Sequence, residues 1–202
     1  MIEVRDYPKI QCPFVRKTIG GHYLATSEVT PGYEWVFEDA GVLAVDKLHG
    51  TNVCVILEEG IVQAIHNRTQ VLVDSPCIDV NLGGQAGRAI EGIIHNMKSL
   101  QDRDGRIYGE LIGPKINGNL HCLKHHMFVP FDYLKERCHW KSWVRNDYPK
   151  TFESISDWFL TLPSLYTKRV TSTNEPAEGL IFYHPDGRMA KLRRDMFDWY
   201  WN

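Results

Sequence analysis

The sequence of 202 residues lacks any apolar run that approaches the roughly 20 residues needed to cross a bilayer. Half of its first six residues, MIEVRD, are charged, and no apolar segment of a secretion signal follows them. The five cysteines are odd in number and contain no C-x-x-C pair, which is typical of reduced thiols. These absences predict a cytoplasmic protein without a membrane span or a disulfide framework.

The sequence also lacks a Pro/Gly/Ser-rich linker and internal repeats, so we expect one domain over residues 1–202. A net charge of −2 argues against a chain that is permanently coated with nucleic acid. Residues 115–150 nevertheless hold seven basic and three acidic side chains, with Trp140, Trp143 and four histidines among them. Such a stretch can neutralise phosphates and stack on bases, or it can be a solvated surface whose tryptophans turn inward.

Hydrophobic periodicity predicts mostly strands joined by hairpins. Alternation favours strands at 42–48, 107–112, 127–134 and 179–183, a hairpin of 52–58 with 61–66, and a last strand at 188–193 after a turn at Asp186-Gly187. Helical spacing predicts helices over 84–101 and 152–162. Since parallel β-α-β alternation is absent, the fold class is α+β with antiparallel sheets flanked by helices.

The most informative segment surrounds Lys47, at the end of the strand 42–48. A lysine at a strand end can act as a nucleophile when burial and cationic neighbours favour its neutral form. Gly50, three residues on, allows the backbone to approach a ligand closely. By itself the segment is more typical of an exposed lysine before a turn.

Six short motifs in a fixed order strengthen the nucleophile interpretation. They are KLHGTN at 47–52, NRT at 67–69, YGEL at 108–111, FVPFD at 128–132, EGLI at 178–181 and KLR at 191–193. In this order they resemble the covalent nucleotidyltransferases, the superfamily of ATP-dependent polynucleotide ligases and mRNA capping enzymes. The histidine of K-x-H-G resembles the RNA ligase 2 branch, since DNA ligases and capping enzymes usually have K-x-D-G. The resemblance implies a nucleotidyltransferase (ATP-grasp-like ligase) fold and an ATP-dependent RNA ligase.

The resemblance implies the catalytic roles. Lys47 would attack the α-phosphorus of ATP and form a lysyl-AMP adduct. Lys191, Arg193 and a bound Mg²⁺ (or Mn²⁺) would favour its neutral form and stabilise charge on the α-phosphate. Glu178 would hold the metal through water, and Glu110 would hold metal-bound water or accept from the ribose hydroxyl.

The remaining matched positions would bind the nucleotide or the RNA end. Phe131 would stack on the adenine, while Arg68 and Asn52 would grip a phosphate, either of the nucleotide or of the RNA 5′ end. The resemblance therefore implies a nucleotide site composed of Asp46, Lys47, Leu48, Asn52, Arg68, Glu110, Phe131, Glu178, Lys191 and Arg193.

Two features depart from the family pattern. The K-x-K of the last motif is K-x-R here, since Arg193 replaces the second lysine, so a proton-sharing role at that position is in doubt. Only eight residues follow Arg194. Neither an OB-fold nor a second RNA-recognition domain fits into them, so RNA recognition would come from this domain's own surface or from a protein partner.

Other interpretations stay open at this point. The chain could be a DNA ligase, a GTP-dependent capping-type enzyme, a ligase limited to pre-adenylated ends, or a non-catalytic RNA-binding module that retains the fold. His121-Cys122, His125-His126 and Cys138-His139 contain zinc-ligand types, but their spacing fits no standard zinc pattern.

Overall fold

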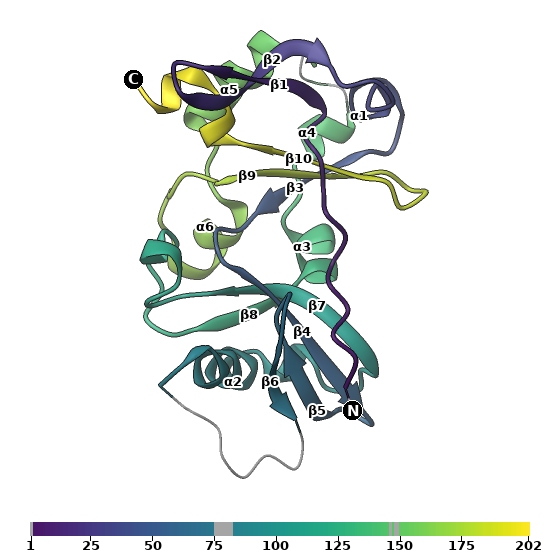
Figure 1. The fold of residues 1–202 in the computed structure, drawn as a ribbon, viewed down its shortest axis with the longest axis vertical. Helices are drawn as coiled ribbons and strands as arrows, with labels where there is room; N and C mark the ends of the chain where they lie inside the picture. Colours follow the sequence, from purple (N-terminus) through teal and green to yellow (C-terminus); the bar gives the residue numbers. More distant parts are fainter. Residues whose placement is uncertain (1, 75–82, 146, 148–149) are drawn as a thin grey trace. The chain divides into compact units, whose positions relative to one another are not determined.

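The computed structural model describes residues 2–74, 83–145, 147 and 150–202, and these divide into two compact units. Unit 1 consists of Met1–Pro8 and His49–Tyr133, and unit 2 of Lys9–Leu48 and Leu134–Asn202. Within the described residues, every pair of neighbouring strands in the sheets is antiparallel (Figure 1). The predicted α+β class with antiparallel sheets is thus confirmed.

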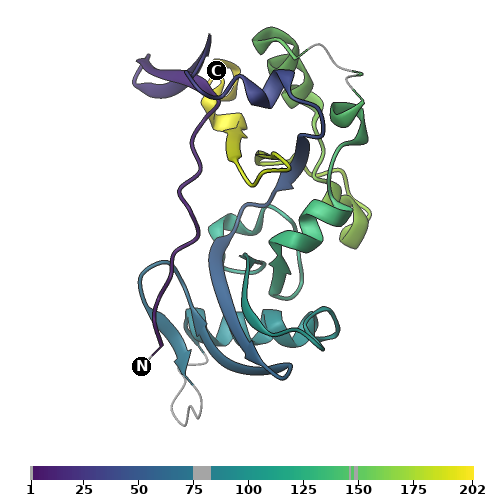
Figure 2. The ribbon, with the colours of Figure 1, turned by 90° about the vertical axis from the view of Figure 1, so that its right-hand side faces the viewer.

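Unit 1 is built on a five-stranded sheet with the order β6-β5-β4-β7-β8. Helix α2 lies along one side of this sheet (Figure 2). The elements of the unit are β4 (Thr51–Glu58), β5 (Ile61–His66), β6 (Val71–Asp74), α2 (Gln85–His95), the 3₁₀ turns η1 (Met97–Ser99) and η2 (Asn117–Asn119), β7 (Gly105–Ile112) and β8 (Met127–Pro130).

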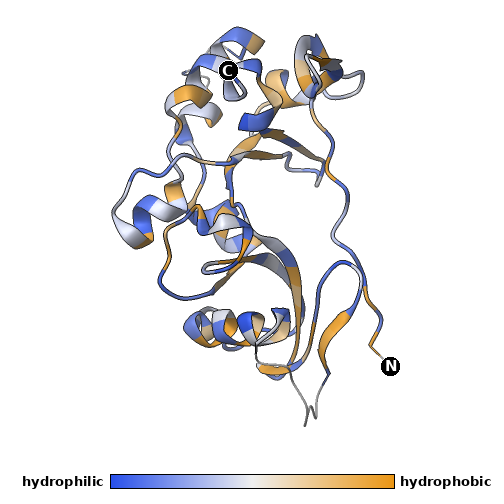
Figure 3. Ribbon diagram, turned by 60° about the vertical axis from the view of Figure 1, so that its left-hand side comes forward, coloured by the Kyte–Doolittle hydropathy of each residue, from blue (hydrophilic) through white to orange (hydrophobic). Residues whose placement is uncertain are grey.

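The two faces of this sheet differ because successive side chains of a strand point to opposite sides. One face joins the apolar side of α2 in a core that includes Val53, Leu111 and Ile93. Figure 3 shows the mixed polar and apolar positions of α2 that such one-sided packing needs. The other face carries polar side chains, among them Asn52 and Tyr108.

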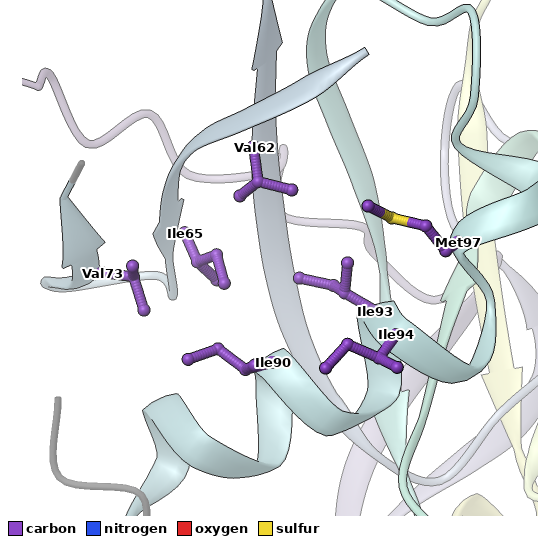
Figure 4. Close-up of a pocket in the computed structure, with 7 residues that line it drawn as sticks. All are labelled: Val62, Ile65, Val73, Ile90, Ile93, Ile94 and Met97. Carbon is purple, nitrogen blue, oxygen red and sulfur yellow. The ribbon is translucent and has the colours of Figure 1, made fainter. Parts of the chain in front are cut away.

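An apolar cavity of about 240 Å³ lies between β5, β6 and α2 (Figure 4). Its lining is entirely apolar: Val62, Ile65, Val73, Ile90, Ile93, Ile94 and Met97. It contains none of the predicted site residues, so it is not the expected nucleotide site.

Unit 2 is built on a three-stranded sheet, β10-β9-β3, and a β1–β2 hairpin. A large aromatic core that includes Trp143, Phe159 and Phe182 packs against the sheet. The elements are β1 (Phe14–Ile19), β2 (His22–Val29), α1 (Trp35–Glu38), β3 (Leu43–Lys47), α4 (Lys141–Val144), α5 (Phe152–Thr161), α6 (Leu165–Thr171), β9 (Gly179–Tyr183), β10 (Met189–Arg193) and the 3₁₀ turns η3 (Arg194–Met196) and η4 (Asp198–Tyr200).

Most predicted elements are present, and two differ from their predicted ranges. The strand expected over 127–134 ends at Pro130, and α3 (Phe131–Arg137) begins at the next residue. Proline has no N–H to donate to a sheet, and the Asp132 side chain accepts from the backbone N–H of Tyr133 in the first turn of the helix. The helix expected over 84–101 ends earlier, at His95, and continues as η1.

No helix in the described ranges is long and apolar enough to cross a bilayer. Cys12, Cys54, Cys122 and Cys138 carry free thiols, and Cys77 lies outside the described residues. The tryptophans of the basic stretch turn inward, since Trp143 is buried and Trp140 packs against the core of unit 2.

Candidate active site

Lys47 is the last residue of β3, and its ammonium group is paired with Glu178. Nζ lies 2.6 Å from Glu178 Oε2 and 3.3 Å from the carbonyl oxygen of Leu48. Both charged side chains are largely shielded, with 21% of Lys47 and 13% of Glu178 exposed. A short, partly buried hydrogen bond between opposite charges holds the Lys47 amine in a fixed place beside Glu178.

The register of the three-stranded sheet places the cationic residues on one face. Gly179 of the central strand β9 lies between Lys47 of β3 and Arg193 of β10. Two residues further along β9, Ile181 pairs with Lys191 of β10. Because residues i and i+2 of a strand share a face, Lys47, Lys191 and Arg193 project from the same side of the sheet. This register is the one that the predicted grouping of Lys47 with the two cations of the last motif requires, and their joint role stays a prediction.

Arg193 lies between two carboxylates and has a buried N–H group without an acceptor among the described residues. Its terminal nitrogens lie 2.8 Å from Asp195 Oδ2 and 3.9 Å from Glu178 Oε1. Nε is buried and has no hydrogen-bond partner among the described residues. A buried donor without an acceptor costs about 1–3 kcal/mol, so an anion that accepts from Nε would be stabilised here. This donor fits a phosphate oxygen.

Asp46 and Leu48, the neighbours of Lys47, turn into the fold. Asp46 is 1% exposed, and its Oδ2 accepts from Ser164 Oγ at 2.8 Å and from the backbone N–H of Tyr166 at 2.9 Å, at the N-terminus of α6. Burial raises the pKa of Asp46 to about 6, and the charge of Glu178 adds to the rise. The Leu48 side chain is buried. The Asp46 carboxylate accepts hydrogen bonds at the start of a helix, and the Leu48 side chain packs in the interior. The roles of both residues in nucleotide binding stay predictions.

Asp46→Asn should change how stability depends on pH. Between about pH 4 and pH 6 the folded chain keeps a proton on Asp46 that the unfolded chain has released, so the free energy of unfolding falls as pH rises. Relative to the wild type, the variant should gain up to about 3 kcal/mol between pH 4 and pH 7. Urea unfolding at several pH values measures this difference, and a constant offset between the two chains would contradict it.

Asn52 and Glu110 lie side by side on the polar face of unit 1. They are directly opposed in the β4–β7 ladder, and Cys54 and Tyr108 form the next pair on the same face.

The turn before β4 packs closely on β7, because a Cβ at Gly50 would lie 2.4 Å from the Leu111 carbonyl oxygen. A larger residue than glycine therefore cannot occupy this position of the motif without moving the backbone.

Two side chains hold this turn through contacts that the sequence did not predict. His121 is 2% exposed, and its Nε2 accepts from the backbone N–H of His49 at 2.9 Å. Asn117 donates to the Gly50 carbonyl oxygen at 2.6 Å. The sequence offered His121 only as an RNA contact or a zinc ligand; its 72-residue separation from His49 left no local signal.

Arg68 and Phe131 contact the N-terminal segment of unit 1. Arg68 Nε donates to the Asp6 carboxylate, and the Phe131 ring packs 4.7 Å from the ring of Tyr7. Since Phe131 lies in the first turn of α3 and not on a strand, its predicted setting was wrong, while its stacking role stays a prediction.

The carboxylates suit a hard divalent cation. Among the described residues, no three His, Cys, Asp or Glu side chains form a group that could hold a metal ion. A Mg²⁺ that is bound by one or two carboxylates, its own waters and nucleotide phosphates needs no such group. The carboxylate of Glu178 in unit 2 and that of Glu110 in unit 1 are each the kind of ligand that the ion prefers, and the zinc interpretation of the His/Cys motifs gains no support.

The predicted residues are divided between the units. Unit 2 carries Asp46, Lys47, Leu48, Glu178, Lys191 and Arg193, and unit 1 carries Asn52, Arg68, Glu110 and Phe131. Within unit 2 the structure brings together Lys47, Glu178 and Arg193, and within unit 1 it brings together Asn52 and Glu110.

Comparison with known proteins gives a consistent result. The family model described as RNA ligase matches residues 42–197. A variant of Naegleria gruberi RNA ligase solved with ATP and Mn is 21% identical, with a TM-score of 0.51, and the match covers 93% of this chain and 62% of that one. A second variant of that ligase with ATP and Mn is 22% identical, with a TM-score of 0.50 and coverages of 95% and 62%.

At these identities the likeness shows a shared fold. The chain spans about three fifths of the length of these solved proteins. No curated protein matches the sequence.

Proposed function

Because the chain belongs to the RNA ligase family, we propose that it is an ATP-dependent enzyme that joins RNA 3′-hydroxyl and 5′-phosphate ends through a lysyl-AMP intermediate. The observation that carries the proposal is the shielded Lys47–Glu178 pair on the sheet face of Lys191 and Arg193. The six ordered motifs support it, and so does the fold shared with a ligase that was solved with ATP and Mn.

The proposed reaction consists of three transfers. Lys47 Nζ, after losing a proton and separating from Glu178, attacks the α-phosphorus of ATP; a P–N bond forms and pyrophosphate leaves. An oxygen of the RNA 5′-phosphate then attacks the same phosphorus, the P–N bond breaks, and an adenylated 5′ end results. Finally the 3′-hydroxyl attacks the 5′-phosphorus and releases AMP.

In the proposed reaction the cationic side chains would bind phosphate, and the carboxylates would hold the metal ion. Arg193 Nε, a buried donor, would donate to a phosphate oxygen, and Lys191 would add positive charge on the same face. Glu178 and Glu110 would hold Mg²⁺ or Mn²⁺ through water, and the ion would supply positive charge beside the α-phosphate. Asn52, Arg68 and Phe131 would bind phosphate and base, with Asp46 and Leu48 supporting the nucleophile strand.

The proposal also covers the setting of the enzyme. We propose that both units act as one adenylation domain over residues 1–202, in the cytoplasm, in the repair of nicked or broken RNA. A protein partner would supply further RNA recognition.

Intact mass spectrometry tests the proposal. Incubation with ATP and Mg²⁺ should add the mass of one AMP, and incubation with GTP should add nothing. An adduct from GTP alone would favour a capping-type enzyme, and no adduct from either nucleotide would favour an RNA-binding module. Both outcomes contradict the ligase proposal.

The acceptor is tested separately with nicked duplexes that carry either a 5′-phosphate or a pre-adenylated 5′ end. A complete RNA ligase should seal both RNA substrates. Sealing of the pre-adenylated end alone would indicate an enzyme that lacks the middle step, and sealing of DNA alone would indicate a DNA ligase.

A further inference from the structure

The N-terminal segment, residues 2–8, runs along the polar face of the sheet of unit 1. Two strand residues hold its backbone: Arg106 donates to the Glu3 carbonyl oxygen at 2.7 Å, and the Tyr108 hydroxyl donates to the Arg5 carbonyl oxygen at 2.9 Å. The carbonyl groups of Glu3 and Arg5, two residues apart, thus bind the side chains of Arg106 and Tyr108, which are two residues apart on β7. This match fixes the register of the segment, and with it the places of Asp6 and Tyr7.

Arg106 is itself held in place. Its NH1 donates to Nε2 of the buried His66 at 3.0 Å, since a guanidinium can only donate. His66 Nδ1 therefore carries the ring proton and donates to the Asn67 carbonyl oxygen at 2.8 Å. Arg106, which holds the N-terminal segment, is thereby linked through His66 to Asn67, the residue that precedes Arg68.

Asp6 holds Arg68 by one edge of the guanidinium only. Nε lies 2.9 and 3.1 Å from the two carboxylate oxygens. No hydrogen bond among the described residues uses the terminal amino groups of Arg68, which form the fork that binds phosphate. A carboxylate on Nε restricts the rotation of the guanidinium and leaves that fork available.

Tyr7 holds Phe131 from one side. Its ring lies 4.7 Å from Phe131 at an interplanar angle of 57° and 5.4 Å from Tyr108 at 54°. Tilted packing of this kind fixes the orientation of a ring, and a base stacks best on an aromatic ring whose orientation is already set.

We propose that Asp6 and Tyr7 are positioning residues for the nucleotide site, where Asp6 orients Arg68 toward a phosphate and Tyr7 orients Phe131 toward a base. This inference rests on the proposed function. One short segment thus prepares both groups before the ligand arrives, which lowers the entropic cost of binding.

The test is a double-mutant cycle on binding. ATP with Mg²⁺ and a 5′-phosphorylated nicked RNA duplex are titrated separately into a Lys47→Ala chain, in which no adduct forms. Asp6→Ala should weaken binding of at least one probe by up to about fivefold, the upper end of the range for an exposed ion pair. Asp6→Ala combined with Arg68→Ala should bind no more weakly than Arg68→Ala alone, because the carboxylate acts through the guanidinium.

Two further variants complete the test. Glu3→Ala removes a carboxylate from the same segment without touching Arg68, so it should bind both probes normally. Tyr7→Ala should weaken ATP binding, and Tyr7→Phe, which keeps the ring, should restore it. Additive losses in the cycle for both probes, or tighter binding by Asp6→Ala, would overturn the inference. A chain that binds neither probe would overturn the proposed function as well.

Discussion

Replacing Lys47 by alanine is expected to abolish the AMP adduct, with a loss of at least about 1,000-fold against the wild type. Among the described residues, Lys47 is the lysine that lies at the end of β3 with its amine 2.6 Å from Glu178 and on the sheet face of Lys191 and Arg193. Without a nucleophilic amine, ATP can still bind but no P–N bond can form. Intact mass after incubation with ATP and Mg²⁺ measures the loss directly.

A second variant separates chemistry from folding. Lys47→Arg keeps a cation beside Glu178 and should keep the stability of the fold, yet its guanidinium stays protonated and cannot attack phosphorus. We therefore expect it to be folded, to bind ATP and to form no adduct. Lys17→Ala, which removes an exposed lysine of β1, should form the adduct normally. An adduct that survives in both Lys47 variants would assign the nucleophile to another residue.

Local signals in the sequence predicted most of the fold. The strands β3, β4, β5, β7, β9 and β10 alternate apolar and polar residues or are short apolar runs, and each lies close to its predicted range. The β1–β2 hairpin was missed, although Gly20-Gly21 between two short runs is a typical turn signal. The error after Pro130 arose because FDYL suits a strand as well as a helix, and the pattern of apolar residues does not decide between them.

The site was predictable in its residues but not in its contacts. The motifs named Lys47 and Glu178, which are 131 residues apart, and their pairing follows once β3 and β9 are neighbours. Strand alternation does not show that Asp46 caps α6, because the partners belong to a helix that was not predicted. Likewise, the contact of Asp6 with Arg68 depends on a backbone register that the side chains of Arg106 and Tyr108 set.

Among glycine-to-alanine substitutions in unit 2, Gly179→Ala is expected to lower the free energy of unfolding most. Gly179 lies between Lys47 and Arg193 in the sheet, and a Cβ there would lie 2.1 Å from the Leu192 carbonyl oxygen and 2.8 Å from the Arg193 Cα. Both are backbone atoms of β10, so the strand itself would have to move. Overpacking typically costs 1–3 kcal/mol, and because backbone must yield here we expect about 3 kcal/mol. The midpoint of urea unfolding measures this cost.

The comparison with Gly20→Ala shows whether the clash is the cause. Gly20 has a φ of 58° and open space around its missing side chain, so its substitution should cost only the roughly 1–2 kcal/mol of left-handed backbone strain. The two variants should also differ in chemistry. Gly179→Ala separates β9 from β10 beside Arg193 and should lose adduct formation even at temperatures where it stays folded, whereas Gly20→Ala should keep it. If Gly179→Ala were as stable and as active as the wild type, the close spacing of Lys47, Glu178 and Arg193 would not depend on this glycine.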